Sequence, residues 1–152
     1  MNNQRGRVLG LDYGAKTVGV AVSDPLRLTA QSLEIIRRKD ETHLRATMRR
    51  IQEIIAEYGV TEIVLGLPLN MDDSVGERAR RTIDFQKALA AKTGLPVRLS
   101  DERLTSVEAE EAMKLAGVKG KEQKKYVDRV AAAIILQDWL NAHAQEADES
   151  GS

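Results

Sequence analysis

Four acidic residues fall where strands and a helix could bring their carboxylates together. Asp12 directly follows the first apolar run of the chain. Asp101 and Glu102 follow a later apolar run, and Asp128 lies within an apolar helical segment. Because strand ends in an α/β sheet converge on one edge, where ligands usually bind, we expect these carboxylates to meet there. Such an oxygen-only cage suits Mg²⁺ or Mn²⁺. Two such ions about 3.5–4 Å apart can activate a water and stabilise the leaving oxygen in phosphodiester cleavage.

Each carboxylate also has an ordinary structural explanation. Asp12 could accept hydrogen bonds from backbone N–H groups in a hairpin turn. Asp101 and Glu102 precede a predicted helix, and acidic residues are favoured near a helix start by the macrodipole. Asp128 could form an exposed ion pair with Arg129, although adjacent residues do not face each other on a helix. The residue types therefore permit a metal site without requiring one.

Asp128 is the most informative of the four, because it heads a helical stripe. Residues 128, 132, 135 and 139 share one side of a helix, and here they are Asp, Ala, Ile and Trp. A lone buried carboxylate is costly, so this one needs a partner or a metal. The chain has no cysteine, which excludes a thiol nucleophile. We expect its two histidines, His43 in the first turn of a helix and His143 in the C-terminal tail, to be bystanders.

The apolar pattern predicts the elements that position these groups. Three strands with short connections, within 8–11, 18–22 and 28–36, predict an antiparallel meander. Helical spacing then begins at Leu44 and stops at Gly59. Ser74 with Glu77, and Thr105 with Glu108, have the spacing of capping boxes. The remaining predicted elements are a strand over 62–66, a helix from the first capping box to 92, a strand over 97–100, a helix from the second box to Gly117, and a helix over 122–141.

This order predicts an α/β fold with a mixed five-stranded sheet. Three antiparallel strands come first, and the alternating helix–strand units that follow favour parallel pairing. Helices on both faces give the simplest packing. A chain of 152 residues suits one domain, which we place at 1–140. The polar, acidic segment 141–152 is expected to be a disordered tail.

The charge balance and the apolar runs narrow the class of protein. Lys plus Arg total 23 and Asp plus Glu total 23, so the formal net charge is zero. A globally basic nucleic-acid coat protein is excluded, whereas a local basic surface is not. The longest apolar run, 130–136, is too short to span a bilayer. The first residues lack the apolar stretch of an export signal. We therefore expect a cytoplasmic protein without a membrane partner.

Basic residues gather in four places, and each gathering could be an ordinary solvated surface. The segment before Asp128 is the best candidate for holding phosphates, because a basic loop there would lie beside a metal ligand. It contains Lys119, Lys121, Lys124 and Lys125. The other gatherings are Arg37-Arg38-Lys39, then Arg45 with Arg49 and Arg50, and then Arg78 with Arg80 and Arg81.

Four motifs in order make the chain resemble the YqgF family. They are Gly10-Leu11-Asp12-Tyr13-Gly14 with 19–24, then 66–72 (GLPLNMD), then 101–106 (DERLTS), and then Asp128 with the Ala131-Ala132 and 135–137 that follow it. The resemblance spans residues 8–137. It implies an RNase H-like fold and a metal-dependent nuclease whose acidic residues match Asp12, Glu102 and Asp128. Members of that family are named as candidate Holliday junction resolvases and candidate pre-16S ribosomal RNA nucleases.

The resemblance leaves some site residues open. Side chains alternate along a strand, so only one of Asp101 and Glu102 should face a metal, and Asp101 stands as the substitute ligand. Arg103, in the same motif, joins the lysines as an expected nucleic-acid contact. The chain has Asp73 where the family often has Gly after the Met-Asp pair. Asp is among the few other residues that tolerate positive φ, so the loop shape is affected more than the chemistry.

Three classes of function compete on the sequence. The first is a two-metal nuclease for ribosomal RNA processing, with junction cleavage as the alternative. In it Asp12 would bridge the metals, while Glu102 and Asp128 would bind one each. The second is a kinase or ATPase fragment, because an Asp-x-Gly hairpin also opens that superfamily; those proteins need two lobes. The third is a non-catalytic nucleic-acid-binding module. No motif distinguishes RNA from branched DNA as partner, or a monomer from a homodimer.

Overall fold

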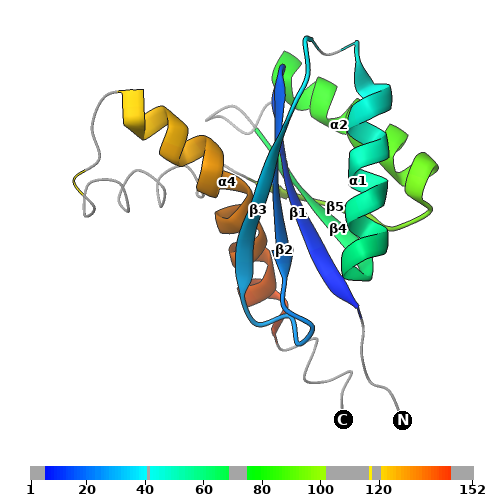
Figure 1. The fold of residues 1–152 in the computed structure, drawn as a ribbon, viewed down its shortest axis with the longest axis vertical. Helices are drawn as coiled ribbons and strands as arrows, with labels where there is room; N and C mark the ends of the chain where they lie inside the picture. The colour runs from blue at the N-terminus through cyan, green and yellow to red at the C-terminus, as the bar shows by residue number, and fades with distance from the viewer. Residues whose placement is uncertain (1–5, 41, 69–74, 102–116, 118–120, 145–152) are drawn as a thin grey trace.

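The computed structural model describes residues 6–40, 42–68, 75–101, 117 and 121–144, and for 121–129 it describes only the course of the helix. Strands and helices alternate after an initial strand meander, as the sequence predicts (Figure 1). The elements are β1 (Arg7–Tyr13), β2 (Thr17–Ser23), β3 (Ala30–Arg37), α1 (Leu44–Tyr58), β4 (Val60–Leu67), α2 (Glu77–Thr93), β5 (Val97–Asp101) and α4 (Lys121–Ala142). The helix predicted between residue 105 and Gly117 lies outside the described residues.

One five-stranded sheet organises the molecule, with the strand order β3-β2-β1-β4-β5. β1 pairs with β2, and β2 with β3, in antiparallel fashion. β1 pairs with β4, and β4 with β5, in parallel fashion. The predicted mixed sheet is therefore confirmed. β1 lies at its centre, and the carboxyl ends of β1, β3, β4 and β5 reach the same edge.

Helices cover both faces of the sheet, as the sequence predicts: α1 and α2 on one side, α4 on the other (Figure 1). The face under α1 and α2 carries the larger core, made by strand residues such as Leu9, Leu11 and Leu65 with Ile51 and Phe85 of the helices. The face under α4 carries a smaller cluster, described below. No described helix combines the length and the apolar character that crossing a membrane would need.

Glycines end the two helices of the larger core at the predicted positions. Gly59 follows α1 with φ 66°, and Gly94 follows α2 with φ 72°. In each case the glycine N–H donates to a carbonyl of the last helical turn, Ile55 or Ala90. The positive φ explains why glycine stands there, because it reaches this region without steric cost.

The start of α2 differs from the prediction. The capping box of Ser74 and Glu77 places the cap at Ser74, but the helix begins at Glu77 with Gly76 as its N-cap and no side-chain cap hydrogen bond. Glu77 instead accepts a hydrogen bond from Arg81, one turn along the helix, at 2.9 Å. The spacing of a capping box was thus a misleading signal, because Glu77 uses its carboxylate for an i,i+4 ion pair.

The end of α4 lies slightly beyond the predicted domain boundary. The helix continues to Ala142, so the first two residues of the predicted tail are helical. His143, expected in the tail, stacks on Trp139 with ring centroids 4.1 Å apart, and its Nδ1 lies 2.8 Å from the Trp139 carbonyl oxygen. Residues 145–152 lie outside the described part of the chain.

Candidate functional site

Asp12 lies within β1, on the face of the sheet that α4 covers. It pairs with Gly19 of β2, one residue before the strand ends. Side chains alternate along a strand, so Asp12 shares a face with Val8, which packs in the cluster under α4. Asp12 is partly buried and makes a polar interaction within the fold. Asp12 therefore lies in the strand and not in the turn of this hairpin, which is closed by a hydrogen bond from the Gly14 N–H to the Thr17 carbonyl oxygen at 2.7 Å.

Gly10, two residues before Asp12 on the same face, lets α4 approach the sheet closely. A β-carbon at Gly10 would stand 2.7 Å from Cβ of Leu136 and 3.0 Å from the carbonyl oxygen of Ala132. Real β-carbons do not approach so closely, so only glycine fits without a shift of the helix. The predicted apolar stripe on α4 is confirmed at Ala132 and Ile135, which pack against the sheet and are each 1% exposed. Asp12 thus follows a strand segment that α4 fixes in place.

Asp101 ends β5 on the opposite face from Asp12. It pairs with Leu67 of β4, and it is in phase with Val97 and Leu99, which pack against the core under α1 and α2. By alternation, the residue after Asp101 would return to the face of Asp12 if the strand direction continued. Asp101 has a polar interaction of its own within the fold. The structure therefore separates Asp101 from Asp12 and does not bring the two together.

Most of the other predicted site residues are not described at the level of side chains. Glu102, Arg103 and Lys119 lie outside the described residues. The course of α4 includes positions 121, 124, 125 and 128, so Lys121, Lys124, Lys125 and Asp128 lie on the first turns of that helix. Among the described residues there is no group of three or more His, Cys, Asp or Glu that could hold a metal ion. Of the predicted ligands, the structure therefore defines the position and burial of Asp12 and of the substitute Asp101.

Two arginines lie close to the aromatic ring of Tyr13, the residue directly after Asp12. The Tyr13 ring stacks on Phe85 of α2 at a centroid distance of 4.1 Å. The guanidinium carbons of Arg38 and Arg78 lie 4.8 and 5.2 Å from the Tyr13 centroid. Sequence reasoning placed both arginines only in general basic gatherings, because nothing in their spacing indicates that they converge on Tyr13.

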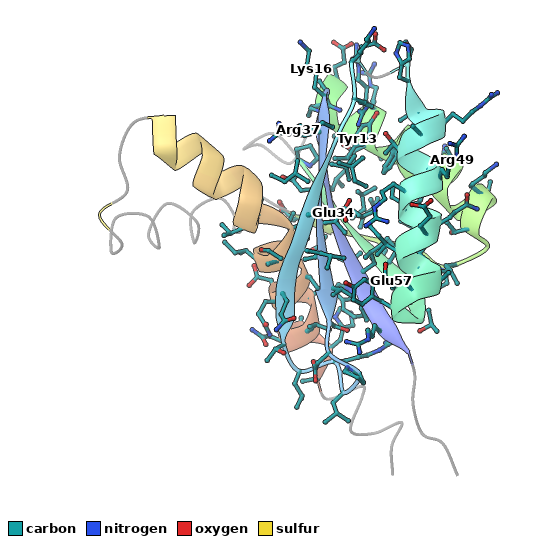
Figure 2. The ribbon with its side chains drawn as sticks, viewed as in Figure 1. Tyr13, Lys16, Glu34, Arg37, Arg49 and Glu57 are labelled. Carbon is teal, nitrogen blue, oxygen red and sulfur yellow. The ribbon has the colours of Figure 1, made fainter. Side chains whose placement is uncertain are left out.

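The carboxyl edge of the sheet beside Asp12 is rich in positive charge. Arg38 donates from Nη2 to the Gly14 carbonyl at 2.7 Å, which fastens the end of β3 to the β1–β2 turn. Lys16 and Arg37 are exposed at this same edge, near Tyr13 (Figure 2). Arg37 pairs with Thr17 and is in phase with Ile35, the residue opposite Gly19, so it shares the face of Asp12. This edge would attract an anionic ligand.

The structure divides the basic residues of α1 into two kinds. Arg50 donates to both carboxylate oxygens of Glu34 on β3, at 2.9 and 2.6 Å, and to Glu53 at 3.2 Å. This hydrogen-bonded contact with Arg50 lowers the pKa of Glu34. Arg45 and Arg49 are exposed, and no acidic partner for either is found in the described part of the chain. Arg50 is therefore held within the fold, whereas the side chains of Arg45 and Arg49 face solvent.

His43 has a structural contact rather than a place near Asp12. It occupies the N-cap position of α1, and its Nδ1 lies 2.9 Å from a carboxylate oxygen of Asp40. The Thr42 hydroxyl donates to the same oxygen. These hydrogen bonds, from Thr42 first and then His43, lower the pKa of Asp40. With His143 on Trp139, each histidine has a contact within the fold.

Solved structures place this architecture in the RNase H-like class of α/β folds. The structure of Thermus thermophilus RuvC in complex with a Holliday junction substrate superposes with a TM-score of 0.58 at 15% identity. The match covers 92% of this chain and 96% of that chain. At this identity the likeness concerns the fold, which is the one the sequence predicts.

The chain belongs to the RuvX family, also called YqgF, since the family model described as "RuvX: Holliday junction resolvase" matches residues 6–142. A protein of Lachnospira eligens is 52% identical over 136 residues, covering 90% of this chain and 97% of that protein. One of Symbiobacterium thermophilum is 46% identical over 144 residues, covering 95% and 98%. Both relatives carry the name "Putative pre-16S rRNA nuclease".

Proposed function

We propose that this protein is a metal-dependent nuclease that hydrolyses phosphodiester bonds in the 5′-end maturation of pre-16S ribosomal RNA. The observation that carries the proposal is the placement of Asp12. Its carboxylate lies on the α4 face of the central strand, near the carboxyl edge where α/β folds bind ligands. Membership of a nuclease family and the names of close relatives support the same activity.

We assign Asp12, Glu102 and Asp128 as the catalytic and metal-binding carboxylates. Alternation along β5 supports Glu102 over the substitute Asp101, because Asp101 is in phase with the opposite core. The packing of α4 supports Asp128. Val8 lies in a cluster with Leu136 and Leu140, and Gly10 meets Leu136 and Ala132. Moving along β1 toward Asp12 therefore corresponds to moving along α4 toward residue 128.

The described part of the proposed site is compatible with a divalent cation. Asp12 offers a carboxylate that is partly buried, and hard cations prefer oxygen ligands. Mg²⁺ or Mn²⁺ bound there, as a pair of ions, would supply an activated water and stabilise the leaving oxygen. The role of the protein chain is to hold the carboxylates in place. Gly10 contributes by allowing α4 to pack directly against the strand that carries Asp12.

The surrounding basic residues would hold the phosphate backbone. We assign this role to Lys119, Lys121, Lys124, Lys125 and Arg103, because their positions in the sequence adjoin the proposed ligands. The exposed Arg37, on the face of Asp12, extends this positive surface to the other side of β1. We further propose that residues 1–140 act as a single domain followed by an acidic tail, and that the protein works in the cytoplasm as a monomer or homodimer.

Resolution of Holliday junctions is the second candidate function, and the description of the family favours it. A resolvase must cut two strands symmetrically, which calls for paired active sites on a two-fold dimer. RNA processing has no such requirement. The two functions therefore differ in the substrate cut, in the symmetry of the cuts and in the oligomeric state.

A panel of labelled substrates tests the proposal, with Mg²⁺, with Mn²⁺ and with EDTA. It contains RNA with a ribosomal precursor 5′ extension, single-stranded DNA, duplexes and a four-way junction. We expect metal-dependent cuts in the precursor RNA that disappear with EDTA and in Asp12→Asn. Symmetric cuts confined to the junction would establish the resolvase instead. The absence of any cleavage would overturn the nuclease and favour a binding module.

A further inference from the structure

A groove lies between α1 and α2, the two helices on the face of the sheet opposite α4. It has a volume of about 650 Å³ and is open to solvent. Leu44, Met48 and Ala88 provide its apolar surface. The charged residues that line it are Arg45 and Arg49 of α1 and Lys92 of α2, and all three are exposed. The described lining contains no acidic residue.

None of the three cations of the groove has an acidic partner in the described part of the chain, in contrast to two other arginines of these helices. The neighbouring Arg50 is held by Glu34 and Glu53, and Arg81 of α2 is held by Glu77. Lys92 is near α1, since Gln52 Nε2 donates to its carbonyl oxygen at 3.4 Å. Three cations around one groove repel each other at low salt, and a bound polyanion would relieve that repulsion.

We propose that this groove, lined by Arg45, Arg49 and Lys92, binds the phosphate backbone of the nucleic-acid substrate at a distance from the scissile bond. The inference rests on the proposed function for the identity of the ligand. Arg45 lies in the first turn of α1, which follows the carboxyl end of β3 (Figure 1). A strand that leaves the Asp12 face can reach the groove across this edge, where Lys16 and Lys39 are exposed. Figure 2 shows Arg49 projecting from the outer side of α1.

The charge of the groove favours nucleic acid over a second copy of this chain. A two-fold dimer formed over the groove would place Arg45 and Arg49 of one copy against the same groove of the other. Such like-charge contacts disfavour association. A phosphate backbone carries a charge at each nucleotide and complements a row of cations.

The test measures binding separately from cleavage, with the full chain in EDTA. The probes are a fluorescein-labelled stem–loop RNA with a single-stranded 5′ extension and a labelled four-way DNA junction. Fluorescence anisotropy gives Kd over a series of salt concentrations for the unaltered chain, for Arg45→Gln/Arg49→Gln and for Arg80→Gln/Lys87→Gln. The last double is the matched control. It also removes two positive charges from exposed helical positions, but from residues that do not line the groove.

We expect the groove double to weaken binding of at least one probe on the order of tenfold, and to reduce the slope of log K against log salt by about 1.4–1.8. The control double should change neither quantity by a comparable amount. Lys92→Gln, from the other helix, should reduce the slope by about 0.7–0.9. It provides an independent result if the α1 double is unstable by thermal unfolding. Binding to both probes that does not change in the groove variants, or that changes equally in the control, would overturn the inference.

Two further outcomes separate this inference from the proposed function. If the groove variants alter the sedimentation of the protein but not its nucleic-acid binding, the groove is a protein interface and the inference fails. If the unaltered chain cuts no substrate with Mg²⁺ or Mn²⁺ but shows the groove-dependent binding, the nuclease proposal fails and the groove remains a phosphate site.

Discussion

The two faces of the central sheet are built from side chains of different size. The face under α1 and α2 buries large residues such as Leu11, Leu65 and Phe85, each at most 2% exposed. To the face under α4 the strands contribute smaller residues, including Gly10 and Ala21, which meet Ala132 and Leu136 of the helix. Large side chains keep a helix at a distance from the strands, whereas small ones allow its backbone to approach. We call the first face the thicker layer and the second face the thinner layer. The thicker layer holds the larger core, and the thinner layer lets α4 pack directly on the strand that carries Asp12.

The largest expected effect is a difference in cleavage rate between variants of Asp12 and Asp101, which lie on opposite faces of the sheet. Asp12→Asn should reduce metal-dependent cleavage about a thousandfold or more, because it removes the charge of a proposed metal ligand on the α4 face. Asp101→Asn should retain most of the activity, since Asp101 is in phase with the opposite core. Single-turnover cleavage rates, beside circular dichroism spectra of both variants, provide the measurement. Equal loss in the two variants would remove the distinction between the faces.

The thicker layer should respond to truncation in stability rather than in chemistry. Leu65 is fully buried in the core under α1 and α2. Leu65→Ala leaves a cavity there, and we expect the free energy of unfolding to fall by about 2–5 kcal/mol. Urea unfolding measures this loss. Cleavage per folded molecule should remain close to that of the unaltered chain, and a specific loss of cleavage would show that this face also positions the site.

The thinner layer should respond to a single added methyl group. Gly10→Ala places a β-carbon against Leu136 and the Ala132 carbonyl oxygen, so α4 must shift. We expect the free energy of unfolding to fall by about 1–3 kcal/mol, as for other overpacked sites. Unlike Leu65→Ala, it should also slow cleavage in the molecules that remain folded. Full activity with unchanged stability would contradict the close approach.

The smallest effect concerns the ion pair between β3 and α1. Arg50 lowers the pKa of Glu34, so the pair stabilises the folded state when Glu34 is ionised. Its contribution is therefore complete above the ordinary value of 4.5 and is lost as the pH falls through the lowered pKa. Both side chains are partly exposed, so Glu34→Gln should cost only about 0.2–1 kcal/mol at neutral pH. The free energies of unfolding of the unaltered chain and Glu34→Gln, measured with urea, should become equal below the lowered pKa of Glu34. A difference that stays constant with pH would show that the ionised pair is not its cause.

The sequence predicted the order of elements because each leaves a local signal. Apolar alternation, helical spacing and the glycines at 59 and 94 mark the strands and the helix ends, and the structure agrees with them. The start of α2 was predicted wrongly because Glu77 has two possible partners of similar spacing, and the ion pair with Arg81 forms. Local sequence patterns therefore predict the type of element well. They predict the side chain that caps a helix less well.

The candidate site was predictable only in part, for a physical reason. Asp12, the Asp101-Glu102 pair and Asp128 were identifiable as candidates because carboxylates at strand ends and on an apolar helix are unusual, and the family resemblance then favoured Glu102 over Asp101. The placement of Arg38 and Arg78 on Tyr13 was not predictable, since three segments distant in sequence meet there. The difference between Arg50 and Arg49 was also hidden, because it depends on which helical face meets Glu34.

A metal-rescue experiment tests the central claim most directly. A sulfur atom replaces a non-bridging oxygen at the cleaved phosphate of the precursor RNA, at the bond mapped with the substrate panel. Mg²⁺ binds sulfur poorly, whereas Mn²⁺ accepts it more readily. We predict that the substituted RNA is cut slowly in Mg²⁺ and that Mn²⁺ restores the rate in the unaltered chain, with no restoration in Asp12→Asn. Equal cleavage of both RNAs in either metal, or full restoration in Asp12→Asn, would contradict a metal-dependent site built on Asp12.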